Sequence, residues 1–359
     1  MSTIETATLA PGAALPLDHD EISAARERLR GIAVRTPLLE YRELNCRVGG
    51  RVLLKAETFQ RAGSFKFRGA YNRLAQLTRP ERKRGVVAYS SGNHALGIAT
   101  AAAMVGTAAT LVMPHDAPRI KLDKVRRSGA RIVFYDRISE SREQLAQRIA
   151  DDTGAIVVPS FDDRHIVAGQ ATVAAEAFDQ LSQRDLSADQ LLASCGGGGL
   201  TAGCALAAAC RSATTKVYAV EPLGFERIGR SLLAGTPVSI QGSARSICDS
   251  LMVPSPGHLT FAILRALLAG TAAVSDAEVA AAMLAAFLDA KLVLEPGGAA
   301  ALAAVLSSKI DGRDKTTVVV CSGGNVDAET YTDLLHRASK DMIGGISADA
   351  RLRVATVNE

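Results

Sequence analysis

The sequence predicts an α/β protein with mainly parallel sheets flanked by helices. Short runs rich in β-branched residues alternate with helical stretches along most of the chain, and this order is typical of strand–helix–strand units. The runs are apolar throughout and do not alternate with polar residues, as in strands that helices cover on both faces. No Pro- or Ser-rich linker separates the units, so any second domain has to be an insertion in the first.

The individual elements follow from these runs and from the periodic stretches between them. Strands are expected at 51–57, 85–90, 107–113, 130–136, 155–160, 190–195, 216–221 and 316–322. Helices are expected near 65–77, 94–105, 118–128, 139–152, 169–181, 199–210, 276–291, 298–310 and 327–337. The uncharged stretch 95–113 has the length of a membrane span, but it is rich in small residues and Gly106 interrupts it. A buried helix followed by a buried strand is therefore predicted there.

Composition excludes several classes of protein. The 359 residues are 48% hydrophobic and 22% charged, which allows a large core and excludes a disordered chain or a coiled coil. Lys and Arg number 41 against 37 Asp and Glu, and aromatic residues make up 4% with no Trp. Neither nucleic acid nor a membrane is therefore expected as a partner.

Cysteine usage and the N-terminus predict a cytoplasmic protein. The six cysteines are scattered and include no CxxC pair, so neither a zinc site nor a disulfide framework is indicated. The N-terminal segment has no basic start and no long apolar run, which favours a loose arm over a secretory signal.

Four consecutive glycines follow the strand predicted at 190–195 and precede a helix. Gly196, Gly197, Gly198 and Gly199 free the backbone to direct its N–H groups toward one point, where the helix N-terminus adds partial positive charge. A phosphate group suits such a loop, and a merely flexible turn is the alternative. The phosphate-binding loop of nucleoside triphosphate enzymes has Lys after its last glycine. Here Leu200 follows Gly199, so that type of site is not expected.

The same loop leaves a nicotinamide-dependent oxidoreductase open as a rival function. Gly197 and Gly199 match the first two glycines of a dinucleotide-binding fingerprint, with Ala202 at the third position. Glu221 ends the following strand, where an acid that binds ribose belongs. Against this interpretation, the unit lies past the middle of the chain and leaves the polar loops at 90–94 and 322–325 unexplained. A catalytically silent binding protein is a further, weaker alternative.

Lys66 is the candidate nucleophile. It falls in the first turn of the helix predicted at 65–77, where the helix dipole disfavours its charge, and Phe65 and Phe67 flank it. These features favour a lowered pKa and an amine able to form a Schiff base, although an ordinary solvated lysine is the alternative. Together with an isolated phosphate loop, such a lysine indicates pyridoxal 5′-phosphate as cofactor.

The chain also resembles a known family in the order of its motifs. The motifs are Thr36-Pro37-Leu38, Ser64-Phe-Lys-Phe-Arg-Gly-Ala70, Ser90-Ser-Gly-Asn-His94, Gly196-Gly-Gly-Gly199, Glu295-Pro-Gly-Gly-Ala299 and Ser322-Gly-Gly-Asn325. This order is similar to that of the threonine/serine dehydratases, a family that includes serine racemase. The resemblance, from about residue 20 to 335, implies the tryptophan-synthase β fold, which is pyridoxal-phosphate fold type II with two open, twisted, mainly parallel sheets.

The resemblance implies roles for residues around the cofactor. Lys66 would hold the cofactor and later remove the α-proton of the substrate, with Phe65 packed near the ring. Asn93 would bind the ring hydroxyl and Ser322 the pyridine nitrogen, while Glu295 would lie close to the cofactor. As a neutral hydroxyl, Ser322 cannot hold that nitrogen protonated, which disfavours transamination.

By the same resemblance, the remaining motif residues would bind the phosphate and the substrate. The phosphate would lie on Gly196, Gly197, Gly198 and Gly199. The substrate carboxylate would lie on Ser91, Gly92, Asn93 and His94. The implied reaction is ammonia release from a β-hydroxy amino acid such as L-threonine or L-serine. Serine racemisation, in which Ser91 would face the α-carbon opposite the lysine, and dehydration of 3-hydroxyaspartate stay open as alternatives.

The resemblance also implies a division into domains and a subunit arrangement. We expect an N-terminal arm over 1–19, a large cofactor-binding domain over 20–84 and 159–335, a small inserted domain over 85–158 and a C-terminal tail over 336–359. The cofactor would lie between the two domains, and closure of the small one would exclude water. A homodimer or homotetramer is expected by analogy.

Three positions depart from the family's pattern. Some relatives bind a divalent cation through a carboxylate at the position of Glu221 and another six residues later, where this chain has Arg227, so no metal is predicted. The segment 246–257 is unusual and is expected to border the substrate side chain. Arg142 matches a position near the substrate in some relatives, but an exposed helix arginine is the interpretation we favour.

Overall fold

The computed structural model describes residues 4–5, 16–90, 92–117, 119–240 and 245–355. Its strands form two sheets. The first has seven strands in the order β1 (Ile4–Glu5), β10 (Gly270–Val274), β9 (Lys216–Pro222), β8 (Gln190–Ser194), β11 (Thr316–Cys321), β3 (Arg51–Ala56) and β2 (Leu38–Glu40). The second has four strands in the order β6 (Arg131–Tyr135), β5 (Ala109–Pro114), β4 (Val86–Tyr89) and β7 (Ile156–Val157).

Both sheets are mainly parallel, as predicted. The four-stranded sheet is parallel throughout, and the seven-stranded sheet has antiparallel pairs only at its edges, between β1 and β10 and between β2 and β3. In the register of the central pair, Cys321 at the end of β11 lies beside Ala56 at the end of β3. The carboxyl ends of these strands therefore open at the same edge of the sheet, where ligands bind in such folds.

Helices surround the sheets and account for most of the remaining chain. They are α1 (His19–Leu29), α2 (Arg42–Val48), α3 (Lys66–Leu74), α4 (Arg79–Arg84), α5 (Asn93–Val105), α6 (Arg119–Arg127), α7 (Arg142–Thr153), α8 (Arg164–Ser182), α9 (Gly199–Arg211), α10 (Arg227–Ala234), α11 (His258–Leu267), α12 (Asp276–Ala290), α13 (Pro296–Leu306) and α14 (Ala328–Ala355). The short helices η1 (Glu57–Phe59), η2 (Arg61–Gly63) and η3 (Asp249–Leu251) lie in loops. No helix within the described ranges is both long and apolar enough to cross a membrane.

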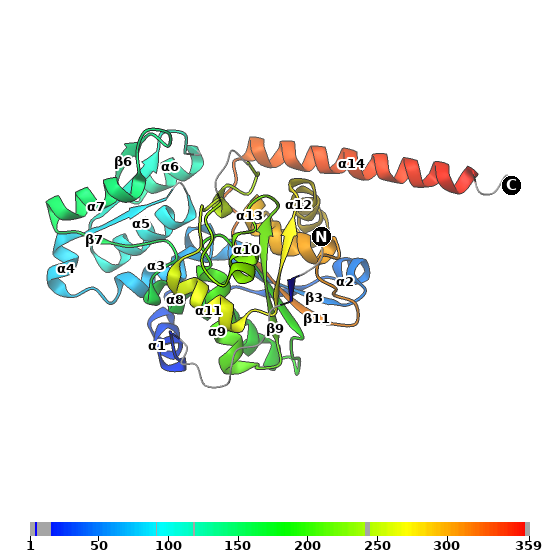
Figure 1. Ribbon diagram of the computed structural model, residues 1–359, viewed down its shortest axis with the longest axis horizontal. Coiled ribbons are helices and arrows are strands. Elements are labelled where there is room, and N and C mark those ends of the chain that lie inside the picture. The colour runs from blue at the N-terminus through cyan, green and yellow to red at the C-terminus, as the bar shows by residue number, and fades with distance from the viewer. Residues whose placement is uncertain (1–3, 6–15, 91, 118, 241–244, 356–359) are drawn as a thin grey trace.

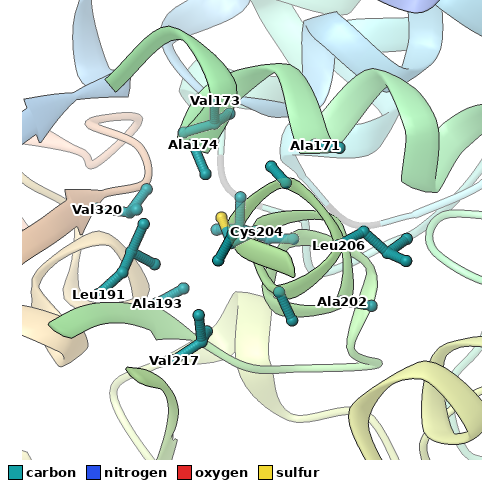
Figure 2. Close-up of a cluster of buried hydrophobic side chains, with 14 of the residues drawn as sticks. Ala171, Val173, Ala174, Leu191, Ala193, Ala202, Cys204, Leu206, Val217 and Val320 are labelled. Atoms are coloured by element: carbon teal, nitrogen blue, oxygen red, sulfur yellow. The ribbon is translucent and has the colours of Figure 1, made fainter. Parts of the chain in front are cut away.

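Each sheet has a hydrophobic core on both faces, because successive side chains of a strand point to opposite sides. Val318 and Val320 of β11 pack with α8 and α9, whereas Val319 and Cys321 pack with α12 and α13. Figure 2 shows the first of these cores, where Leu191 and Val320 face Val173 and Cys204. The uniformly apolar runs in the sequence are thus explained by burial on two faces.

The elements of the four-stranded sheet lie together at one end of the molecule, and α14 projects from the opposite side (Figure 1). This sheet and its helices cover 86–157, and the proposed boundaries of an inserted domain at 85–158 stay a prediction. Most of the expected N-terminal arm, 1–3 and 6–15, lies outside the described residues, while α1 begins at His19.

Some elements differ from the prediction. Helix α14 extends to Ala355, far beyond the predicted 327–337 and into the segment expected as a tail, and no proline interrupts it. Strand β10 was not predicted, because its sequence, Gly-Thr-Ala-Ala-Val, has little intrinsic preference for a strand. Pairing with β9 along its whole length makes it a strand.

Candidate active site

Side chains from both sheets meet at one place. Ser194 ends β8 and Ser322 follows β11, and the hydroxyl of the first donates to that of the second over 3.1 Å. Asn93 begins α5 after β4 of the other sheet, and its amide donates to the carboxylate of Glu295, which caps α13. The motifs at 90–94, 295–299 and 322–325, far apart in the sequence, are therefore neighbours in space.

Lys66 is the first residue of α3, as its position in the sequence predicts. The backbone N–H of Phe65 donates to the carbonyl of Ser322 over 3.1 Å, which ties the start of α3 to the end of β11. The partly buried Nζ of Lys66 donates to the carbonyl of Ser160 over 2.7 Å and lies 5.2 Å from the centre of the Phe65 ring. Burial lowers the pKa of Lys66 to about 8, so an appreciable fraction of the amine is neutral and nucleophilic near pH 7.

The glycine loop turns sharply between β8 and α9. Gly198 has φ of 99°, a left-handed conformation that glycine adopts without strain. The hydroxyl of Thr260 donates to the carbonyl of Gly197 over 2.7 Å, and a Cβ added at Gly197 would lie 2.4 Å from the ring of Phe161. The loop thus has no room for a side chain at Gly197, and the N–H groups at the start of α9 make it suited to an anion.

Asn93 is fixed on both sides of its amide. Its Nδ2 donates to Glu295 Oε1, and its Oδ1 accepts from Asn325 Nδ2 over 2.9 Å. Asn325 also donates to the carbonyl of Ala62, and its own Oδ1 accepts from Lys124 Nζ over 2.8 Å. The orientation of the Asn93 amide is therefore determined by its neighbours.

Glu295 is a buried carboxylate beside a buried lysine that sequence reasoning missed. Burial raises the pKa of Glu295, and the ammonium of Lys121, 3.6 Å from Glu295 Oε2, opposes that rise. Lys121 Nζ also donates to Asp249 over 3.1 Å. Nothing in the sequence of the basic helix α6 distinguishes Lys121 from its exposed neighbours, and only its 3% exposure does so.

The predicted substrate loop is described in part. His94 is buried and its Nε2 donates to the carbonyl of Val158 over 3.1 Å, which leaves Nδ1 without a hydrogen. Burial, with the nearby charge of Lys66, lowers the pKa of His94 to about 3, so the ring is neutral. The N–H of Gly92 donates to the hydroxyl of Ser90 over 3.1 Å. Ser91 lies outside the described residues.

Ser322 is placed to act as a neutral hydrogen-bond donor. The residue is 6% exposed, and its hydroxyl accepts from Ser194 over 3.1 Å and donates to the carbonyl of Gly297 over a long 3.5 Å. At neutral pH a serine hydroxyl carries no charge. The predicted contact of this uncharged hydroxyl with the pyridine nitrogen stays a prediction.

An ion pair occupies the position where some relatives would bind a cation. The guanidinium of Arg227 lies 3.6 Å from the carboxylate of Glu221, and both side chains are buried. Glu221 also accepts from the backbone N–H groups of Ile228 and Gly229 over 3.0 and 3.1 Å. Its carboxylate is thus used by the start of α10, which argues against the ribose contact of the nicotinamide alternative.

Arg142 is not the exposed helix arginine that was predicted. Its side chain is 26% exposed, and its guanidinium lies 5.6 Å from the centre of the Tyr89 ring. The error arose because Arg142 begins a helix with a polar sequence, whereas Tyr89 at the end of β4 covers it in the fold.

The residues present fit a pyridoxal-phosphate site. Four groups lie close together: the nucleophilic amine of Lys66, the glycine loop at the start of α9, the fixed amide of Asn93 and the neutral hydroxyl of Ser322. Their chemistry suits the aldehyde, phosphate, ring hydroxyl and ring nitrogen of that cofactor. The fold and the site together define a pyridoxal-phosphate enzyme of fold type II.

The chain belongs to the family of pyridoxal-phosphate dependent enzymes, whose model matches residues 29–323. It is 42% identical to an L-threo-3-hydroxyaspartate ammonia-lyase of a Pseudomonas species over 88% of this chain and 98% of that protein. It is 36% identical to a serine racemase of Schizosaccharomyces pombe over 88% of this chain and 97% of that protein. Among solved structures, maize serine racemase is 32% identical, with a TM-score of 0.83 over 90% of this chain and 98% of that one.

These matches confirm the predicted family, fold class and cofactor, and they agree with the predicted lyase reaction. A nicotinamide-dependent oxidoreductase finds no support among them. The predicted roles of individual residues are not tested by these likenesses and stay predictions.

Proposed function

We propose that the chain is an ammonia-lyase that uses pyridoxal 5′-phosphate to convert a β-hydroxy amino acid into a 2-oxo acid and ammonia. The observation that carries the proposal is the lowered pKa of the Lys66 amine, together with its position beside Ser322. The start of the helix that carries Lys66 is hydrogen-bonded to the backbone carbonyl of Ser322, whose side chain is a neutral hydroxyl. The names of the relatives, ammonia-lyases for 3-hydroxyaspartate and for threonine, support this reaction.

Bound pyridoxal 5′-phosphate would supply an electron sink for the α-carbon of the substrate. Lys66 would hold the cofactor and then, as a free amine with a pKa of about 8, accept the α-proton at Nζ. The β-hydroxyl group would leave as water by taking up one proton, which in the net balance is the proton lost from the α-carbon, and hydrolysis of the resulting enamine would consume one water and release ammonia. The hydrogen-bonded side chains of the site would favour elimination through preorganisation.

The substrate carboxylate would bind at the start of α5. Asn93 would present its N–H group at the positive end of the helix dipole, while the N–H of Gly92 already donates to Ser90. His94, neutral at physiological pH, would contribute a dipole and no charge. Ser91 would belong to the same loop and remains a proposal from the motif alone.

L-Threonine, L-serine and 3-hydroxyaspartate are the substrates to compare. Two of the relatives, from a Pseudomonas species and from Saccharomyces cerevisiae, are named L-threo-3-hydroxyaspartate ammonia-lyases, which favours including the dicarboxylic substrate. Racemisation of serine is the second candidate, supported by the named racemase of Schizosaccharomyces pombe. Chiral analysis of serine alongside an assay of 2-oxo acid separates racemase from lyase.

We further propose that the elements around the four-stranded sheet close over the site during turnover, that the enzyme is a homodimer or homotetramer, and that it is cytoplasmic. Free cysteines at all six positions suit a reducing compartment. No metal is proposed, because the buried guanidinium of Arg227, 3.6 Å from Glu221, would repel a cation at this position.

Borohydride reduction tests the proposal. The purified holoenzyme should absorb in the visible range, lose that absorption on reduction, and carry the label on Lys66 in a peptide map. Lys66→Ala should abolish 2-oxo acid production, whereas Lys83→Ala on the surface helix α4 should leave it unchanged. Full turnover by the Lys66→Ala protein would refute the lyase hypothesis.

A further inference from the structure

Lys121 is a buried lysine that links the two sheets. It belongs to α6, beside the four-stranded sheet, and its Nζ reaches Asp249 in η3 and Glu295 at the start of α13 over 3.1 and 3.6 Å. A buried ammonium needs such partners because it has lost its hydration. Burial alone would lower the pKa of Lys121, but the two carboxylates outweigh it and raise the pKa, so the side chain stays charged.

Glu295 lies between Lys121 and Asn93 and contacts both. One carboxylate oxygen, Oε2, faces Lys121 and makes no hydrogen bond to any described residue, and the other, Oε1, accepts from Asn93 Nδ2. Because both oxygens belong to one rigid plane, the attraction of Oε2 to the ammonium also determines where Oε1 lies. Lys121 therefore controls the acceptor that orients the Asn93 amide.

The amide has one donor left for a ligand. Its Oδ1 accepts from Asn325, and one Nδ2 hydrogen is used by Glu295. An amide nitrogen carries two hydrogens, so the second is available at a fixed angle. A rotation of the amide would place an oxygen where this donor now lies.

We propose that Lys121 is a positioning residue for the reaction: held between Asp249 and Glu295, it fixes the Glu295 carboxylate and thereby directs the Asn93 amide toward the ring hydroxyl of bound pyridoxal 5′-phosphate. The inference rests on the proposed function, since the ring hydroxyl is the group that Asn93 would contact. Lys121 itself touches neither substrate nor cofactor in this role.

The charges around Glu295 explain why the ammonium is needed. The groups that face this carboxylate are Lys121 from α6, Asp249 from η3 and the neutral Asn93 from α5. Burial and Asp249 already raise the pKa of Glu295 against the effect of Lys121, so loss of this ammonium would raise that pKa further. A protonated Glu295 can donate a hydrogen bond as well as accept one, which would weaken its hold on Asn93 Nδ2 and leave Asn325 to orient the amide.

The test compares Lys121→Met and Lys121→Arg with a matched control, Arg126→Met. Arg126 lies on the same helix and pairs with Asp123 at the surface. The readout is the absorbance of the covalently bound cofactor, titrated with pH in the absence of substrate. Loss of the Asn93 donor should destabilise the ionised ring hydroxyl, so Lys121→Met should move the midpoint upward by about one pH unit. Lys121→Arg keeps the positive charge, so its midpoint should lie close to that of the wild type. Arg126→Met should show no shift.

Turnover gives an independent measurement. Lys121→Met should lower kcat by about 10- to 100-fold with a smaller change in KM, because a misplaced ring affects the reacting geometry more than binding. Glu295→Gln should produce the same upward midpoint shift, which keeps the inference testable even if Lys121→Met folds poorly. The double variant should be no worse than Glu295→Gln alone, since Lys121 acts through that carboxylate.

Two results separate the inference from the proposed function. If the wild-type protein takes up no pyridoxal 5′-phosphate, the proposed function fails and the inference with it. If the wild-type protein binds the cofactor on Lys66 but Lys121→Met titrates at the same pH as the wild type, the function stands and the inference is overturned. The inference would also be overturned if the loss of kcat in the double variant were the product of the losses in the two single variants.

Discussion

The amine of Lys66 in α3 donates a 2.7 Å hydrogen bond to the carbonyl of Ser160, a residue that follows β7. The two residues are far apart in the sequence, and the contact places the amine at the junction between the two sheets. A carbonyl stabilises the ammonium less than a carboxylate does, so burial dominates and lowers the pKa of Lys66 to about 8.

Cofactor uptake by the apoenzyme should follow this pKa. The neutral amine is the reactive form, so its fraction falls about tenfold for each pH unit below pH 8 and is nearly complete above it. The rate of uptake, followed by absorbance between pH 6 and 10, should therefore be half-maximal near pH 8 and level off above about pH 9. Nα-acetyl-lysine under the same conditions corrects for titration of the cofactor itself. If the ratio of the uptake rate by the apoenzyme to the reaction rate of Nα-acetyl-lysine did not change with pH, Lys66 would have an ordinary pKa.

Gly197→Ala should weaken cofactor binding more than Gly196→Ala. A Cβ at Gly197 would lie 2.4 Å from the Phe161 ring, whereas one at Gly196 would meet its nearest atom, the carbonyl oxygen of Ser250, at 3.4 Å. Displacement of Phe161 or of the loop moves the N–H groups that would bind the phosphate. Equilibrium dialysis against pyridoxal 5′-phosphate measures the difference, and equal affinities of the two variants would contradict the role of this loop.

Arg68→Met should destabilise the fold strongly. Arg68 and Glu57 are fully buried, and their charged groups lie 2.7 Å apart. Burial alone would raise the pKa of Glu57, but Arg68 lowers it, so removal of the guanidinium takes from this buried carboxylate its ion-pair partner and leaves it the hydrogen bond from Thr36. We expect a loss of about 3–5 kcal/mol in the free energy of unfolding, measured in urea.

The exposed ion pair between Arg164 and Glu21 serves as the control for that experiment. Arg164→Met should change the free energy of unfolding by less than about 1 kcal/mol, because water screens this pair. The double variant Glu57→Gln with Arg68→Met should recover part of the loss, since it removes both charges of this pair. A loss in Arg68→Met no larger than in Arg164→Met would contradict the prediction.

Glu221 should make the protein less stable as pH rises. Burial raises the pKa of Glu221 to about 7 in spite of Arg227, so the folded state keeps a proton that the unfolded state releases near pH 4.5. Between these values the unfolded state binds fewer protons, and stability falls by at most about 1.4 kcal/mol per pH unit. Glu221→Gln should remove this slope from urea denaturation measured at pH 5, 6 and 7. An unchanged slope would show that the native carboxyl is ionised throughout.

Local sequence was sufficient to predict much of the site. The glycine loop and the position of Lys66 at a helix start depend on residues adjacent in the chain, and the predicted strands at 190–195 and 316–322 coincide with β8 and β11. Apolar runs and glycine clusters act through backbone geometry and periodicity, which a single sequence displays directly.

The sequence by itself determined the α/β class, the order of the motifs and, through them, the family and its cofactor. Only the tertiary structure decided that Lys121 is buried against Glu295, that Arg227 is paired with Glu221, and that Gly-Thr-Ala-Ala-Val forms β10. The reason is that burial, ion pairing and strand pairing depend on residues distant in the chain. One basic residue on a polar helix resembles the next until the fold places a carboxylate beside it.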